Sequence, residues 1–272
     1  MTGAGAMDNG RDGRILHERA EGILRLTIDN PPRLNALTLA MWTRLRDLVA
    51  DPSGDESLRC VVITGAGDRA FSAGADISEF ATTRSTYEQV VHFHEDHVLA
   101  CLNTIAACPV PVVAAIRGAC FGGGLEIATV CDIRIAADDA RFGAPVGRLG
   151  FPLAFAETQA LMRLIGHAAT AELLLEGRIY DAATAAARGL VTRVVPAAAL
   201  EEAVNDSIAN ILRNGAMATR AHKAQLQRLI RDSSPVTEAE RMAGYRFAET
   251  EEYRAGIRAF LARNGQGSGP GK

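Results

Sequence analysis

Two segments of the sequence place glycines at the start of a predicted helix that directly follows an apolar strand. The first is AFSAGADISEF at 70–80, in which Asp76 and Glu79 have the spacing of a helix-capping pattern. The second is PVVAAIRGACFGGGLEIATVCD at 111–132, whose helix we expect to begin at about Leu125. Backbone N–H groups at a helix start have no partner within the helix. Two such starts that approach each other can therefore bind an oxygen that gains negative charge during a reaction.

A third candidate for chemistry is the hexapeptide HFHEDH at 92–97. Its pattern resembles most of the two-zinc site of the metallo-β-lactamase family, which would make the chain a metallohydrolase. The hexapeptide lies, however, in a segment whose apolar stripe recurs at helical spacing, through Tyr87, Val91, His94, Val98, Leu102 and Ile105. On an α-helix, His92 points roughly 160° away from His94 and roughly 140° away from His97. We therefore expect no shared metal site, and we expect His94 to line a pocket or fill the core.

Short apolar strands are the elements that must position these segments. ILHER (15–19) and ILRLTID (23–29) predict an antiparallel pair joined by a tight turn. Three β-branched runs follow, at 60–65, 110–116 and 132–137, and helical stretches separate them. This alternation is typical of stacked β and α units whose strands are buried on both faces, so the sequence predicts an α/β fold.

Helical periodicity predicts helices in most of the remaining chain. Thr38 can cap a helix that buries Met41, Trp42, Leu45, Leu48 and Val49. Both ends of the chain are Gly-rich and lack periodicity. We expect four parts: a disordered segment at 1–13, a core at 14–199, a helical region at 200–263 and a flexible tail at 264–272.

Composition excludes several classes of function. The 272 residues are 48% hydrophobic and carry a net charge of −3, so no broad basic field is available for nucleic acid. The longest apolar runs are far shorter than a bilayer span, and the start of the chain lacks the apolar region of a secretory signal. We expect a cytoplasmic protein with no membrane partner. The cysteines include no C-x-x-C pair and are predicted to be reduced core thiols: Cys60, Cys101, Cys108, Cys120 and Cys131.

The sequence resembles the crotonase, or enoyl-CoA hydratase/isomerase, superfamily over roughly residues 15–263. The motifs that carry the resemblance are NPPRLNALT, AFSAGADI, PVVAAIRGACFGGGLEIATVCDIRIAADDARFG and EEYRAGIRAFLARN. The resemblance implies an α/β spiral of repeated β-β-α units, with a C-terminal helical region used for a homotrimer or a dimer of trimers. It also implies an acyl-CoA thioester as substrate, with coenzyme A as part of that substrate and no other cofactor and no metal. The thioester oxygen would be held by the N–H groups of Ala75 and Gly123.

Glu126 matches a position at which family hydratases carry one of two catalytic glutamates. The position that matches the second glutamate is Val146, which disfavours efficient hydration because that reaction uses two carboxylates around one water. A single Glu126 can still move a proton between carbons of a β,γ-unsaturated acyl-CoA. Two structural interpretations of Glu126 stay open, a carboxylate stabilised by the helix dipole and a buried partner for Arg134. Glu157 is acidic and near in sequence, but we assign it no role.

The resemblance also indicates residues that bind the substrate. Arg33 falls where the family often places a basic residue near the CoA phosphates, although it could equally be a solvated loop arginine. We expect the segments 76–105 and 145–157 to form a largely apolar acyl pocket. The remaining predicted substrate-binding residues are Ala73, Gly74, Asp76, Ile77, Phe80, His94, Gly122, Val146, Leu153 and Phe155.

Four functions are compatible with these residues. The first is a lyase or isomerase of the hydratase/isomerase type that uses Glu126. The second is an acyl-CoA decarboxylase or thioester hydrolase of the same superfamily. The third is a non-catalytic acyl-CoA-binding protein, suggested by Val146 and by LAFAE after Pro152, where the family usually has a Gly-rich run. The fourth is the metallohydrolase.

Overall fold

A computed structural model describes residues 13–51 and 55–265, which form two compact units, one that ends at Ile211 and one that starts at Leu212. The predicted disordered segment, apart from residue 13, and the tail from 266 onward lie outside the described residues. We describe each unit by itself.

The larger sheet of the first unit has six strands in the order β1-β2-β3-β5-β7-β10. The predicted hairpin is confirmed, because β1 and β2 pair antiparallel, and its turn is formed by Glu21 and Gly22, both with positive φ. The other neighbours in this sheet are parallel. The bounds are β1 Arg14–Ala20, β2 Ile23–Asp29, β3 Cys60–Gly65, β5 Val112–Ile116, β7 Ile133–Ala137 and β10 Arg193–Val195.

A smaller sheet has the order β4-β6-β8-β9, with β4 Ala70–Ser72, β6 Ala119–Phe121, β8 Arg141–Gly143 and β9 Tyr180–Asp181. β4, β6 and β8 are parallel, whereas β9 runs antiparallel to β8. The chain therefore repeats one unit: a strand in the larger sheet, a strand in the smaller sheet, and then a helix. Two such units are β5-β6-α5 and β7-β8-α6.

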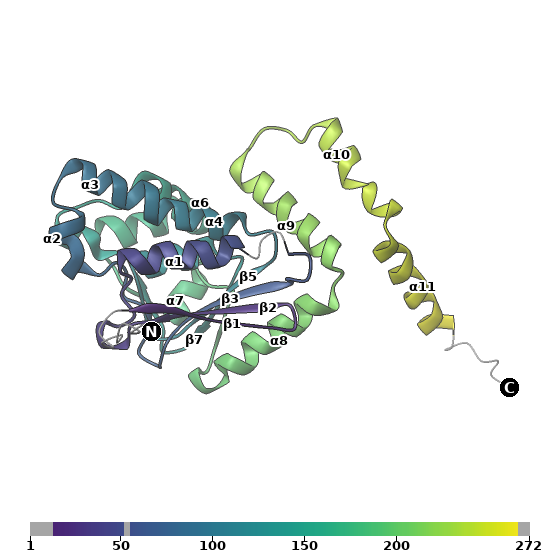
Figure 1. The fold of residues 1–272 in the computed structure, drawn as a ribbon, viewed down its shortest axis with the longest axis horizontal. Helices are drawn as coiled ribbons and strands as arrows, with labels where there is room; N and C mark the ends of the chain where they lie inside the picture. Colours follow the sequence, from purple (N-terminus) through teal and green to yellow (C-terminus); the bar gives the residue numbers. More distant parts are fainter. Residues whose placement is uncertain (1–12, 52–54, 266–272) are drawn as a thin grey trace, which may run out of the picture. The chain divides into compact units, whose positions relative to one another are not determined.

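Helices cover both faces of the larger sheet (Figure 1). On one face α1 packs beside α4, and Thr38 caps α1 by accepting a hydrogen bond from Met41 N, as predicted. On the other face α8 lies against β2, where Arg25 donates to Asn205. The helices are α1 Leu39–Ala50, α2 Phe80–Thr83, α3 Tyr87–His92, α4 Ala100–Ala107, α5 Gly123–Val130, α6 Phe155–Leu175, α7 Ala182–Ala187 and α8 Leu200–Arg213.

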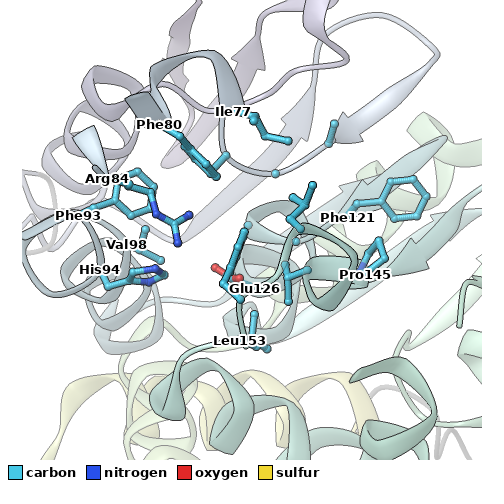
Figure 2. A pocket seen from close by; sticks show the side chains of 18 of the residues that line it. Ile77, Phe80, Arg84, Phe93, His94, Val98, Phe121, Glu126, Pro145 and Leu153 are labelled. Atoms are coloured by element: carbon cyan, nitrogen blue, oxygen red, sulfur yellow. The ribbon is translucent and has the colours of Figure 1, made fainter. Parts of the chain in front are cut away.

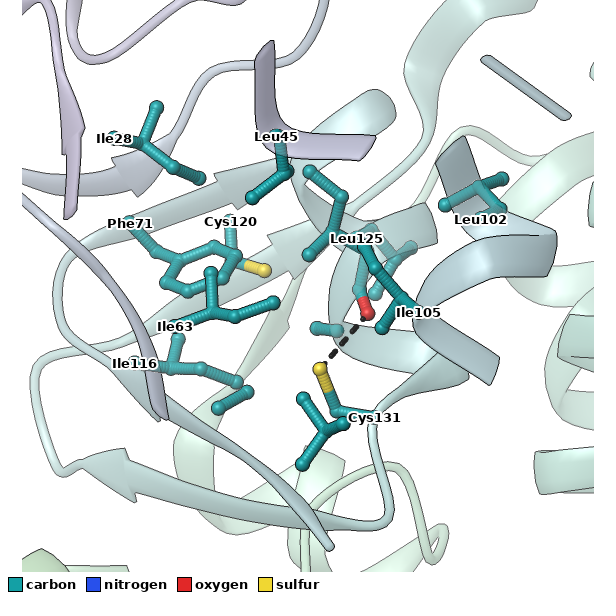
Figure 3. Packing of buried hydrophobic residues seen from close by; sticks show 14 of the residues in the cluster. Ile28, Leu45, Ile63, Phe71, Leu102, Ile105, Ile116, Cys120, Leu125 and Cys131 are labelled. Carbon is teal, nitrogen blue, oxygen red and sulfur yellow. Dashed lines mark hydrogen bonds between the residues drawn. The ribbon is translucent and has the colours of Figure 1, made fainter. Parts of the chain in front are cut away.

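The apolar core fills the space between the sheets and the covering helices (Figure 3). Ile63 of β3, Phe71 of β4 and Leu125 of α5 meet there, so burial of this cluster fixes the second sheet against the first. All five cysteines are buried, which confirms the prediction that they lie in the core. The thiol of Cys131 donates to Ile127 O at 3.2 Å (Figure 3).

The predicted continuous α-helix around HFHEDH is wrong in one respect. Residues Phe93–Leu99 form a π-helical segment between α3 and α4. A π-turn aligns residues i and i+5, so His92 and His97 lie together with their Nε2 atoms 3.2 Å apart instead of pointing apart. The apolar stripe shifts as well, because Tyr87 is 78% exposed and Phe93 is buried. In the part of the chain that the structure describes, no group of three or more potential ligand side chains could hold a metal ion.

The second unit consists mainly of α9 Ala216–Arg231, α10 Glu238–Gly244 and α11 Glu251–Gly265. Glu252 of α11 accepts hydrogen bonds from Met217 N and Ala218 N at the start of α9, and Thr237 and Glu240 form a capping box on α10. Its apolar side chains are exposed in the single chain at Leu226, Leu229, Ile230, Met242, Tyr245, Phe247, Tyr253, Ile257, Phe260 and Leu261. Trimer formation through this region stays a prediction.

Across 13–51 and 55–265, none of the helices has the length and apolar composition needed to cross a bilayer.

Candidate active site

The candidate active site is a cavity of about 300 Å3 at the carboxyl ends of β4, β6 and β8. Because these strands are parallel neighbours, the segments that follow them, 73–76, 122–126 and 144–149, meet at one edge of the sheet. The cavity brings together most of the predicted site residues: Ala73, Gly74, Ala75, Ile77, Phe80, His94, Gly122, Gly123, Glu126, Val146 and Leu153.

The loop after β4 is held against the preceding segment by Leu37. Leu37 N donates to Gly74 O at 2.7 Å, and Asp76 N donates to Leu37 O at 2.8 Å. Ala75 lies between these two bonds, so its own N–H stays available beside the cavity. Gly74 has a φ of +100°, and a Cβ there would lie 3.1 Å from Gly123 N. Glycine at this position is what lets the two loops approach each other.

The loop after β6 opens α5 two residues earlier than predicted. Gly122 has a φ of +46° and a ψ of −120°, which a residue with a side chain rarely adopts, and α5 therefore begins at Gly123 instead of Leu125. The N–H of Gly123, as the first residue of the helix, has no acceptor within the helix. A Cβ at Gly123 would lie 3.6 Å from Ala75 N. Two backbone N–H groups thus lie close together beside the cavity and can bind one oxygen.

Glu126 lies in the first turn of α5 and its carboxyl group faces the cavity (Figure 2). Burial, and then the charge of Glu157, raise the pKa of Glu126 to about 8, while Arg84 acts in the opposite direction. The interpretation of Glu126 as a partner of Arg134 is not supported. Arg134 instead donates to the carbonyl oxygens of Leu190, Ala128 and Cys131.

Val146 lines the cavity from a short 3-10 helix, Pro145–Leu149. Among the described residues that line the cavity, Glu126 is the only one with a carboxyl group. Glu157, in the first turn of α6, is 4% exposed and its Oε2 has no hydrogen-bond partner. Burial raises its pKa, but its side chain does not line the cavity. The charge of Glu157 therefore affects Glu126, although Glu157 does not line the cavity with it.

Arg33 and Asp76 form an ion pair outside the cavity lining. Arg33 Nη1 lies 2.6 Å from both carboxylate oxygens of Asp76, and Asp76 also accepts from Ser78 N to cap the 3-10 helix Ile77–Glu79. Burial acts to raise the pKa of Asp76, but the hydrogen bonds from Ser78 and Arg33 lower it. The side chain of Arg33 is half exposed.

Two other sequence-based expectations differ from the structure. Glu79 does not complete a capping box with Asp76, because its carboxylate accepts from Leu39 N at 2.8 Å and stabilises the start of α1. Phe155, the first residue of α6, is 96% exposed and lies outside the cavity lining. Phe151 lines the cavity from the preceding loop.

Several lining residues were not predicted individually, although all but the first of them lie in the segments 76–105 and 145–157 that were expected to form the pocket. They are Trp42, Arg84, Phe93, Arg148 and Phe151. Arg84 is the most consequential because it brings a positive charge to the cavity. Its guanidinium lies on the same side of the cavity as His94 and points toward Glu126 (Figure 2). Trp42 was correctly predicted as a buried residue of α1, but its contact with Gly123 depends on how α1 packs against α5.

Comparisons with known proteins identify the family of the chain. Residues 18–266 match the family model described as enoyl-CoA hydratase/isomerase. A crotonyl-CoA hydratase from Syntrophomonas wolfei is 35% identical over 254 residues, which cover 92% of this chain and 95% of that protein.

Solved structures are similar over nearly the whole chain. An enoyl-CoA hydratase/carnithine racemase from Magnetospirillum magneticum is 42% identical with a TM-score of 0.89, and the match covers 92% of each chain. An enoyl-CoA hydratase from Bacillus anthracis is 31% identical with a TM-score of 0.85, and the match covers 92% of this chain and 96% of that one. These structures confirm the predicted α/β crotonase-like fold.

Proposed function

The chain belongs to the enoyl-CoA hydratase/isomerase family of the crotonase superfamily, and on this premise we propose that Ala75, Gly123 and Glu126 carry out its chemistry on an acyl-CoA thioester. The N–H groups of Ala75 and Gly123 form an oxyanion hole for the thioester oxygen, and Glu126 transfers the proton. The observation that carries the proposal is that Glu126, alone among the described lining residues, supplies a carboxyl group to the cavity, beside those two N–H groups.

One carboxylate favours isomerisation of a β,γ-unsaturated acyl-CoA over hydration. Glu126 removes a proton from C2, and the electron pair of the C–H bond moves toward the thioester oxygen. When the electrons return, Glu126 delivers the same proton to C4, so the double bond moves and no co-reactant is consumed. Loss of one oxyanion donor typically costs about 3 to 4 kcal/mol of transition-state stabilisation. A Glu126 pKa of about 8 suits a group that must both accept and return a proton near neutral pH.

The surroundings of the cavity support the rest of the assignment. Arg33 binds the CoA phosphates at the mouth of the site, and a guanidinium matches phosphate oxygens in geometry. Coenzyme A enters as part of the substrate, and no other cofactor takes part. The exposed apolar side chains of α9, α10 and α11 supply the contacts of a homotrimer or a dimer of trimers. The protein acts in the cytoplasm.

A parallel assay of crotonoyl-CoA and 3-hexenoyl-CoA, with product detection by mass spectrometry, tests the proposal. We expect isomerisation of 3-hexenoyl-CoA by the wild type and a loss of roughly 10²- to 10⁴-fold in Glu126→Gln. Efficient hydration of crotonoyl-CoA would show that another group replaces the second carboxylate. Turnover that Glu126→Gln leaves unchanged would overturn the role of Glu126.

The same assay separates the alternatives. Tight binding of thioesters without turnover would indicate a non-catalytic binding protein. Release of free CoA or of carbon dioxide would indicate a thioester hydrolase or a decarboxylase. Loss of activity on treatment with a chelator would restore the metallohydrolase hypothesis.

A further inference from the structure

Arg84 enters the cavity from a cage of three phenyl rings. Its guanidinium carbon lies 4.3 Å from the centre of the Phe80 ring, 4.5 Å from that of Phe151 and 5.0 Å from that of Phe93. Phe80 meets each of the other two rings edge to face. Stacking on ring faces holds a guanidinium in place without using the N–H groups at its edge. The cage therefore fixes the position of Arg84 and leaves its hydrogen-bond donors for a ligand.

Among the described residues, no carboxylate neutralises the Arg84 guanidinium, which forms neither a salt bridge nor a hydrogen bond. The backbone N–H of Arg84 donates to Phe80 O at 2.9 Å at the end of α2. Glu126 is the carboxyl group whose charge acts on Arg84. With a pKa of about 8, Glu126 is largely protonated at neutral pH, so it does not offset the positive charge. A half-buried cation without a counter-charge is costly unless a ligand supplies one.

His94 adds a second polar group without a partner on the same side of the cavity. Burial, and then the charge of Arg84, lower the pKa of His94 to about 4, so its ring is neutral at pH 7. Its Nδ1 is buried and has no hydrogen-bond partner in the residues described. Figure 2 shows the His94 ring and the Arg84 guanidinium facing Glu126 together. An apolar acyl chain would leave both groups unsatisfied.

We propose that the acyl group of the preferred substrate carries a carboxylate, and that Arg84 binds this carboxylate with His94 as a second hydrogen-bond partner. The substrate class is then a mono-thioester of a dicarboxylic acid with CoA. A guanidinium matches a carboxylate through two parallel hydrogen bonds, which are stronger than hydrogen bonds between neutral groups. This inference rests on the proposed function, because it assumes that the cavity takes the acyl part of a CoA thioester.

Binding of matched pairs of thioesters tests the inference. Isothermal titration calorimetry at pH 7 would compare succinyl- with butyryl-CoA, glutaryl- with pentanoyl-CoA and adipoyl- with hexanoyl-CoA. Within each pair the CoA part and the chain length are equal, so a difference in affinity reports the terminal group. In at least one pair we expect the carboxylate-bearing thioester to bind roughly ten- to a hundred-fold more tightly.

Two variants assign the preference to Arg84. Arg84→Met keeps a long apolar side chain within the cage and should abolish the preference while pentanoyl-CoA still binds. Arg84→Lys keeps the charge without the planar fork and should retain a smaller preference. Arg163→Met, which removes one exposed positive charge on α6, is the control and should keep the wild-type ratio.

The outcomes separate this inference from the proposed function. If members of every pair bind wild type equally well, or if Arg84→Met keeps the preference, the role of Arg84 is wrong while the acyl-CoA function stands. If no thioester binds, the proposed function fails and the inference fails with it.

Discussion

Gly123 packs against the indole of Trp42 so closely that a Cβ at position 123 would lie 2.6 Å from Trp42 Cζ2. Gly123→Ala must therefore displace either the ring or the start of α5. Displacement of α5 moves the Gly123 N–H away from the thioester oxygen. We expect kcat to fall by roughly 10²- to 10³-fold while the protein still folds, which steady-state kinetics and circular dichroism would check.

Gly147→Ala is a matched control for this substitution. Gly147 belongs to the nearby 3-10 helix, and nothing lies within 4 Å of a Cβ added there. The control should keep nearly wild-type kcat. Equal activity of both variants would show that the position of the Gly123 N–H does not matter for the reaction.

The pH dependence of kcat/KM should report the raised pKa of Glu126. The free enzyme must hold Glu126 as a carboxylate before it can accept a proton. Because the pKa is about 8, we expect kcat/KM to rise about tenfold per pH unit below 8 and to level off above it. A profile that is flat between pH 6 and 9 would contradict this assignment.

The folding stability of the protein should also depend on the ionisation of Glu126, but it should fall with rising pH where kcat/KM rises. A carboxyl group whose pKa is raised in the folded protein stabilises it at low pH, and this contribution is lost as pH rises through about 8. Thermal unfolding of wild type should therefore shift to lower temperature between pH 6 and 9. Glu126→Gln should remove most of this shift, because a neutral amide does not ionise.

Glu157 should influence Glu126 through charge alone. After burial, the charge of Glu157 is the next cause that raises the pKa of Glu126. Glu157→Gln should move the midpoint of the kcat/KM profile to lower pH with little change in the plateau. Glu176→Gln, an exposed change just after the same helix, is the control. A reduced plateau without a shift would mean that Glu157 takes part in the chemistry directly.

His94 should destabilise the protein in acid. Its pKa is lowered from 6.5 to about 4, so between these values the unfolded chain binds a proton that the folded protein does not. Stability is therefore lost as pH falls from 6.5 toward 4. Urea unfolding of wild type and His94→Gln at pH 7 and 5 would measure this. We expect the stability difference between the two pH values to be smaller in the variant.

Local signals in the sequence were sufficient for the elements that carry the two N–H groups. Strand β3 was predicted at its observed bounds, and Thr38 and the buried face of α1 followed from capping and helical spacing. The glycines after β4 and β6 identified the two loops, because few other residues allow a positive φ and a close approach of backbones. Glu126 was identified through the resemblance, because it matches a position at which family hydratases carry a catalytic glutamate.

The rest of the site depends on contacts that no local pattern encodes. Arg84 lies in the polar run TTRST, and its role arises only when the loop that carries Phe151 packs against α2. The π-helical segment Phe93–Leu99 was missed because a fixed 100° rotation per residue assumes an α-helix. That assumption misplaced both His97 relative to His92 and the buried face of the segment.

Val146 offers the most direct test of single-carboxylate chemistry. It lines the cavity with Glu126, at the position where the resemblance to family hydratases implies a second glutamate. Val146→Glu should therefore create hydration of crotonoyl-CoA, with a gain that can reach roughly 10²-fold or more if the new carboxylate holds the water. The new charge beside Glu126 should also raise the Glu126 pKa further and move the kcat/KM midpoint to higher pH. Val146→Gln has a similar shape without the charge and should gain no hydration. If both variants hydrate crotonoyl-CoA equally well, or if wild type already does so efficiently, a second carboxylate is not what limits this site.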